Sequence, residues 1–129
     1  MTKILTFKKR KDFLRVAQGQ YVATHNMVLQ ATRSLFDDDN IRVGYTATKK
    51  IGNAVIRSKS KRRLRAIVRE VLEKNALKHI DYIFIARKDT ANCDFLELKR
   101  DVIYALKRIN KFFLNEDKNN DTPLKKTCD

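Results

Sequence analysis

The sequence has few of the features that mark a membrane-bound or secreted protein. No apolar run approaches the ~20 residues that a membrane-spanning helix requires. The basic segment from Met1 to Lys11 lacks the apolar stretch of a secretory signal. The two cysteines, Cys93 and Cys128, lie far apart in the sequence. We therefore expect no disulfide, no membrane association and a location in the reducing cytoplasm.

The sequence also lacks the residue combinations of a catalytic or metal-binding site. There are three glycines, and Gly52 is not followed by the second glycine that a phosphate-binding loop would need before Lys59. His25 and His79 have no cysteine or carboxylate at metal-ligand spacing. Nucleophile, base and oxyanion-binding groups do not come together along the chain. We expect no catalytic residue, no metal ligand and no cofactor bound by the protein alone.

Carboxylates are missing from a long central segment in which basic residues are abundant. The chain has 29 Lys and Arg against 15 Asp and Glu, a net charge of +14 and a pI near 10.0. A solvated basic face normally interleaves Glu with Lys. The unopposed charge therefore favours a nucleic-acid interface over an anionic membrane surface or an acidic protein partner. Between Asp39 and Glu70 no acidic residue occurs, and ten cations do: Arg42, Lys49, Lys50, Arg57, Lys59, Lys61, Arg62, Arg63, Arg65 and Arg69.

Turn residues and hydrophobic periodicity predict one compact domain over residues 1–114. The predicted fold class is α+β, a small α/β sandwich in the order helix-strand-strand-helix-strand-helix on one sheet. The first strand should bend near His25-Asn26 and form a hairpin with the second. The Asn-rich segment 115–129 is expected to be a disordered polar tail. We expect helices at 12–17, 53–75 and 94–115, and strands at 21–32, 41–48 and 81–86.

The two long helices are each expected to bury one face. The central helix, capped by Asn53 or Ser58, should turn a helically spaced apolar stripe to the core, formed by Leu64, Ile67, Val68, Val71 and Leu72. At ~100° per residue, its cations divide into Lys61, Arg62, Arg65 and Arg69 on one side, and Lys59 and Arg63 on the other. The last helix should bury Phe95, Leu98, Val102, Leu106, Ile109 and Phe113.

Several aromatic residues could stack on unpaired bases. For Phe84, within an apolar run, core packing is favoured, whereas periodicity leaves Phe13 open between core anchor and exposed stacking residue. Tyr21, Phe36 and Tyr45 are further candidates. Gly44 interrupts a predicted strand, which indicates a bulge or a close approach to the backbone.

The central segment resembles a motif of the bacterial ribonuclease P protein subunit, the small basic partner of a catalytic RNA. The family pattern runs Arg-x-Gly, then Ser-Lys-Lys-x-Gly-Asn-Ala-Val-x-Arg-Asn-Arg, then Lys-Arg-x-x-Arg. Here it reads Arg42-Val43-Gly44, then KKIGNAVIR from Lys49 to Arg57, then KRRLR from Lys61 to Arg65. Weaker matches, among them Asp12-Phe13 and the segment 81–87, extend the resemblance over residues 8–110.

The resemblance implies a fold, partners and site residues. It implies a left-handed β-α-β crossover, which the general preference for right-handed crossovers would not predict. The implied partners are the catalytic RNA, with one protein per RNA, and precursor tRNA, whose 5′ leader is removed by endonucleolytic cleavage. Catalysis and the required Mg²⁺ would reside mainly in the RNA. The implied leader-cleft residues are Phe13, Ala17, Gln30 and Tyr45. The implied contacts to RNA are Lys49, Lys50, Gly52, Asn53, Arg57, Ser58, Lys59, Lys61, Arg62, Arg65 and Arg69.

The chain departs from the family pattern at a few positions. Ser58 and Lys59 replace Asn and Arg, and Lys59 keeps the charge but loses the bidentate phosphate geometry of arginine. Ala17 and Gln30 stand where the family often has aromatic residues. A ribosomal or other structural RNA-binding protein is the alternative function. A DNA-binding module would need a base-reading helix and usually a dimer seam, and we find no such seam in the sequence.

Overall fold

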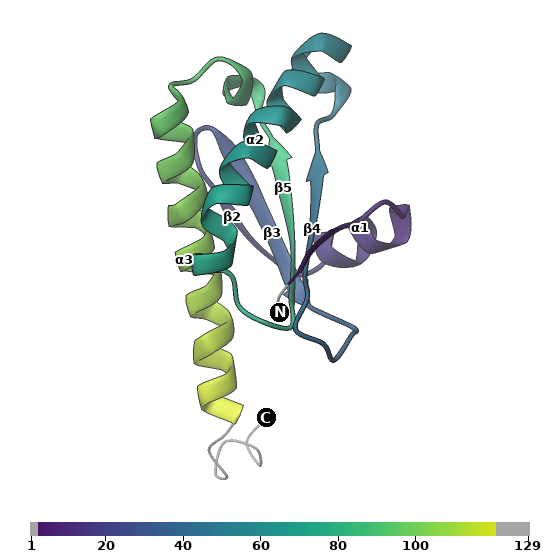
Figure 1. Cartoon of the computed structure of the whole chain (residues 1–129), viewed down its shortest axis with the longest axis vertical. Coiled ribbons are helices and arrows are strands. Elements are labelled where there is room, and N and C mark those ends of the chain that lie inside the picture. Colours follow the sequence, from purple (N-terminus) through teal and green to yellow (C-terminus); the bar gives the residue numbers. More distant parts are fainter. Residues whose placement is uncertain (1–2, 121–129) are drawn as a thin grey trace.

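The computed structural model describes residues 3–120, with side chains to Asp117. Five strands and three helices, with two short 3-10 helices, make up this part of the chain (Figure 1). In chain order they are β1 (Ile4–Thr6), α1 (Arg10–Ala17), β2 (Gln20–Ala23), β3 (Met27–Arg33), β4 (Ile41–Thr46), η1 (Lys49–Ile51), α2 (Ala54–Asn75), β5 (Ile80–Ala86), η2 (Lys88–Ala91) and α3 (Phe95–Asn120). The α+β class is as predicted.

The five strands form one mixed sheet in the order β1-β4-β5-β3-β2. β4 pairs in parallel with β1 and β5, and β3 pairs antiparallel with β5 and β2. Helix α2 connects the neighbouring parallel strands β4 and β5. Both strands point upward in Figure 1, α2 crosses in front of the sheet, and β5 lies to the left of β4. The β4–α2–β5 crossover is therefore left-handed, as the resemblance implied.

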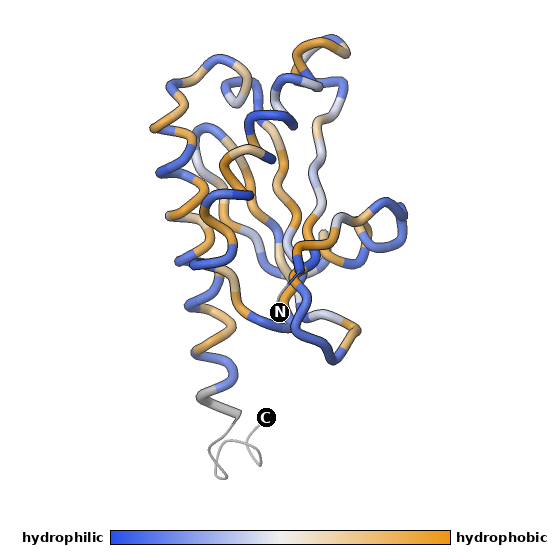
Figure 2. Tube along the Cα trace, viewed as in Figure 1, coloured by the Kyte–Doolittle hydropathy of each residue, from blue (hydrophilic) through white to orange (hydrophobic). Residues whose placement is uncertain are grey.

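Helices cover both faces of the sheet, but unequally. The long helices α2 and α3 pack side by side on one face, and the short helix α1 packs against the other (Figure 1). The middle strands are predominantly hydrophobic, whereas the segment leading into the first turn of α1 is hydrophilic (Figure 2). The central strand β5 is buried along nearly its whole length, as predicted.

The core lies between the sheet and the two long helices. All five residues of the predicted α2 stripe are buried there. In α3 the predicted face is buried except for Phe95, which is 40% exposed. Phe95 occupies the first turn, beyond the edge of the core, where its ring instead lies 5.7 Å from the guanidinium of Arg63. Its predicted core role was wrong.

The predicted pairing of the first strands was wrong in two respects. The segment 21–32 is two strands, β2 and β3, because the chain reverses between Ala23 and Met27, where the hydroxyl and backbone of Thr24 bond to Met27. β4 then pairs with β1 and β5 and makes no hairpin with β3. Strand β1, three residues long, was missed because so short a segment has no readable periodicity.

The last helix runs further than predicted. Residues 115–120, assigned from the sequence to a disordered tail, belong to α3. Glu116 and Asp117 both accept hydrogen bonds from Arg33 at the end of β3, and these ion pairs hold the extension against the sheet. The rest of the predicted tail lies outside the described residues, as does Cys128, and Cys93 is a free thiol.

Candidate nucleic-acid interface

The loop before α2 is built to present two lysines next to a helix N-terminus. Lys49 and Lys50 form the start of the 3-10 helix η1 and are exposed. Gly52 follows with a φ of 150°, a backbone conformation that side-chain-bearing residues rarely adopt. Asn53 then caps α2 by accepting a hydrogen bond from the backbone N–H of Ile56 at 3.0 Å. Of the two predicted caps, Asn53 is the correct one.

One side of α2 carries positive charge that nothing within the described residues neutralises. Arg62, Arg65 and Arg69 are exposed, and Lys61 is half-buried. None of the four makes an ion pair with a described carboxylate. Glu70, the first acidic residue of the helix, is bound to Lys99 of α3 at 2.5 Å. The predicted basic face is therefore present and free of competing anions.

Two arginines of α2 differ from this exposed set. Arg63 points away from it, as predicted, and donates to the carbonyl oxygens of Thr90 and Cys93, so it fastens η2 to α2. Arg57 is half-buried, and its Nε has no hydrogen-bond partner among the described residues. An unpaired buried donor is costly, and the Arg57 Nε is such a donor, out of reach of solvent, whereas Arg63 is fully engaged with backbone carbonyl oxygens.

Tyr45 belongs to the α2 side of the sheet, and its predicted place beside Phe13 was wrong. Successive side chains of a strand point to opposite faces. Gly44 faces α1, so Tyr45 faces α2, where its ring stacks on Phe84 at 5.9 Å and lies under the Arg65 guanidinium at 5.5 Å. Burial raises the pKa of Tyr45 to about 12. The residue therefore remains a neutral platform for Arg65 at physiological pH.

The opposite face of the sheet is open beside α1 and contains the other three predicted cleft residues. The ring of Phe13 lies directly on Gly44, where an added Cβ would come within 2.8 Å of a ring carbon. Gly44 thus marks a close approach, one of the two predicted possibilities. Ala17 is exposed one turn further along α1, and Gln30 is half-exposed on β3. The structure brings Phe13, Ala17 and Gln30 to one face.

An aromatic residue of β2 adds to this open face. Tyr21 lies directly opposite Gln30, Gln30 opposite Ile83, and Ile83 opposite Gly44 in the register of the sheet. Side chains in such a row share one face, so Tyr21 stands in line with the residues under Phe13. Its side chain is 69% exposed. The sequence named Tyr21 as an aromatic candidate, but only the pairing shows that it shares this face.

A buried ion pair fixes α1 to the sheet. Arg15 of α1 donates to Asp81 of β5 at 2.5 Å and to the carbonyl oxygen of Arg33 at 3.0 Å. Asp81 is 1% exposed. Burial raises the pKa of its carboxyl, and the hydrogen bond from Arg15 opposes that shift. The position of Phe13 over the sheet therefore depends on this anchor two residues along the helix.

The described residues offer neither a metal cluster nor a membrane span. No group of three or more His, Cys, Asp and Glu side chains within them could hold a metal ion. No helix in this part of the chain is both long enough and apolar enough to cross a membrane.

Comparison with known proteins gives one consistent result. The family model described as Ribonuclease P matches residues 1–110. The ribonuclease P protein component of Paramagnetospirillum magneticum is 42% identical over 79% of this chain and 80% of its own length. That of Caulobacter vibrioides is 43% identical over 77% of this chain and 66% of its own length. The solved structure of the Staphylococcus aureus RNase P protein superposes with a TM-score of 0.67 at 30% identity, covering 81% of this chain and 94% of that one.

The contact between Phe13 and Gly44 can be tested by a double-mutant cycle. In Gly44→Ala the new methyl group occupies the space of the ring, so we expect the free energy of unfolding to fall by about 1–3 kcal/mol. Phe13→Ala removes the ring, and adding Gly44→Ala to it should then cost much less, because only the 3.3 Å contact of the new methyl group with Ile83 remains. Urea unfolding of the three variants measures the coupling. Additive losses would mean that the ring does not lie on Gly44.

Proposed function

This chain belongs to the ribonuclease P protein family, and from that premise we propose how its surfaces serve the enzyme. As a member it is a protein component of a ribonucleoprotein endonuclease, with a role in processing the 5′ leader of precursor tRNA. Its partner is an RNA subunit. The basic side of α2 and its entry loop form the surface that we assign to this RNA.

The observation that carries the assignment is the unopposed charge of that surface. Exposed Arg62, Arg65 and Arg69 have no described ion-pair partner, and Lys49 and Lys50 extend the charge onto the preceding loop. One arginine guanidinium can donate two parallel hydrogen bonds to the oxygens of a phosphate. Release of counterions from the RNA drives the association. The half-buried Arg57, in the first turn of α2, adds its charge to this surface.

We assign catalysis to the RNA subunit. Lys and Arg side chains neutralise phosphates but do not ligate Mg²⁺, so a surface of this kind suits a protein that supports metal ions held mainly by RNA. We further propose one protein per RNA and a location in the cytoplasm.

The open face beside α1 is our candidate for the unpaired 5′ leader. Phe13 offers one aromatic surface there, and Tyr21 offers a second, on the strand next to Gln30. Family members often have an aromatic residue at the position of Gln30. We propose that Tyr21, one strand away in the same row, supplies stacking in its place. Stacking on such rings is tolerant of sequence, as a binding site for varied leaders requires.

The experiment that tests the function is reconstitution with a bacterial ribonuclease P RNA. Precursor tRNA cleavage is followed at low magnesium, where the RNA needs help to overcome phosphate repulsion. We expect the protein to restore accurate 5′ cleavage and to be inert without the RNA. Binding to the RNA with no rescue of cleavage would favour a structural RNA-binding protein.

Charge removal from α2 should weaken assembly in a salt-dependent way. We expect Arg62→Ala and Arg65→Ala each to lower affinity for the RNA subunit and to reduce the salt slope by about 1. Lys74→Ala, an exposed cation in the last turn of the same helix, is the matched control and should behave like wild type. Unchanged affinity and slope for both arginine variants would remove this face from the interface.

Loss of the Phe13 ring should affect the leader selectively. In the reconstituted complex we expect Phe13→Ala to weaken binding of precursor tRNA by roughly five-fold or more, because a base loses its stacking partner. Binding of mature tRNA should not change. Leu14→Ala, at the neighbouring and 53% exposed position, is the control. Equal losses for both tRNAs would make Phe13 a residue of the core or of assembly.

A further inference from the structure

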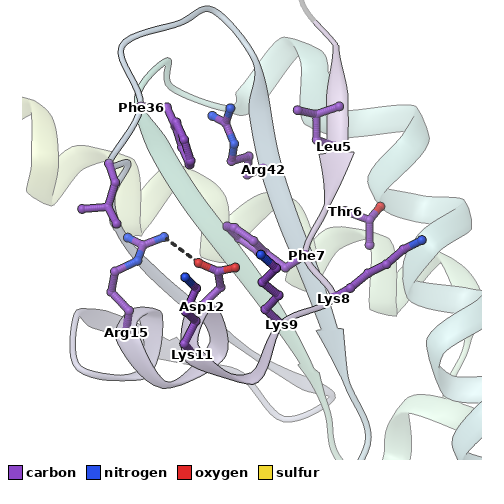
Figure 3. Close-up of a pocket in the computed structure, with 11 residues that line it drawn as sticks. Leu5, Thr6, Phe7, Lys8, Lys9, Lys11, Asp12, Arg15, Phe36 and Arg42 are labelled. Atoms are coloured by element: carbon purple, nitrogen blue, oxygen red, sulfur yellow. Dashed lines mark ion pairs between the residues drawn. The ribbon is translucent and has the colours of Figure 1, made fainter.

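The hollow on the other side of α1 has no part in the surfaces assigned so far. It has a volume of about 580 Å³ and lies between β1, the turn into α1, α1 itself and the loop that precedes β4 (Figure 3). We call it the β1 groove. Lys11, Asp12 and Arg15 face it from α1, whereas Phe13 and Ala17 lie on the opposite side of that helix, at ~100° per residue. Helix α1 therefore lies between the β1 groove and the accessible end of the open sheet face, and the two regions meet where Phe7 of the groove contacts the ring of Phe13 edge-on, with 6.3 Å between their centroids.

The floor of the β1 groove is apolar and unusually exposed. Leu5 is 38% exposed, Phe36 54% and Leu35 73%. The ring of Phe36 packs against Arg42, whose guanidinium lies 4.1 Å from the ring centroid in a cation–π contact. Arg42 is in turn fixed by two hydrogen bonds to Asp38, at 2.7 and 3.0 Å. A flat aromatic ring is thus presented to solvent by a rigid support.

The rim of the β1 groove is cationic. Lys8, Lys9 and Lys11 are exposed and make no ion pair with any described carboxylate. Among the described residues that line the groove, the one carboxylate is Asp12, which lies 3.9 Å from Arg15. An aromatic floor within reach of several unpaired lysines is complementary to a nucleotide, whose base stacks and whose phosphate carries the opposite charge.

We propose that the β1 groove binds an upstream unpaired nucleotide of the 5′ leader, after the leader has crossed the open sheet face. This inference rests on the proposed function. The groove shares α1 with that face, so a strand passing over the helix can reach both. The β1 groove lies at the start of β4, beside Arg42, and the loop assigned to the RNA subunit follows the end of β4. The length of β4 places the groove and that loop roughly 20 Å apart. That separation favours the leader over the RNA subunit as occupant.

The test uses the reconstituted holoenzyme and a series of precursor tRNAs whose leaders grow one nucleotide at a time. We expect wild-type affinity to rise again at the leader length that reaches the groove. Phe36→Ala should lose that late gain, by roughly five-fold or more, and match wild type on shorter leaders. Leu96→Ala, which truncates a similarly exposed apolar residue of α3, should keep the gain.

A charge variant tests the rim without touching the floor. Lys9→Ala/Lys11→Ala should reduce the salt slope for long leaders by roughly 1.4, about 0.7 for each lysine on a single strand. The control is Lys107→Ala/Lys111→Ala, which removes two exposed lysines of α3. The slope for short leaders should be the same in all of these proteins.

Several results would overturn the inference. The inference fails if Phe36→Ala and the lysine variant both bind leaders of every length as tightly as wild type does. If cleavage is still rescued in that experiment, the proposed function stands. Equal losses for mature tRNA would place the body of the tRNA in the groove, and losses in assembly with the RNA subunit would place the catalytic RNA there. If Phe36→Ala instead abolished a dimer of the free protein in sedimentation and left leader binding alone, a second copy of the chain would be the occupant.

Discussion

The burial of β5 on both of its faces is the constraint on which the rest of the structure depends. One face of this strand carries Tyr82 and Phe84 into the core under α2 and α3. The other carries Asp81 and Ile83, each 1% exposed, toward α1. A strand buried on both sides requires cover on both sides. The long helices therefore take one face, and the short helix α1, anchored through Arg15, takes part of the other.

This distribution of the helices over the two faces produces the two surfaces to which we assign RNA and leader binding. Because the apolar stripe of α2 is used for the core, its cations must point outward, where no described carboxylate meets them. Because α1 is short, it covers only part of its face: Gly44 and Ile83 are buried beneath it, and Gln30 and Tyr21, at the other end of the same row, stay accessible. One surface is rich in charge and the other in aromatic rings. These are the two kinds of contact that phosphates and unpaired bases require.

Helix α1 thereby divides its side of the sheet into the two regions that we propose bind the leader. The side chain of Phe13 lies on the open face, and the side chains of Lys11 and Arg15 line the β1 groove. Each region pairs an aromatic ring with a fixed support, Gly44 under Phe13 and Arg42 under Phe36. Rigid supports limit the entropy lost when a flexible strand is bound. The arrangement suits a ligand that is itself unstructured.

Much of the site was readable from the sequence because its signals are local. The absence of carboxylates between Asp39 and Glu70, the Asn53 cap and the helical spacing from Leu64 to Leu72 each depend only on near neighbours in the chain. They determined the basic helix, its buried stripe and the charge of its exposed side. Tertiary structure alone decided the strand pairings, and with them the faces of Tyr21 and Tyr45. A one-residue step along a strand reverses its side chain, and which strands become neighbours depends on contacts between residues distant in sequence.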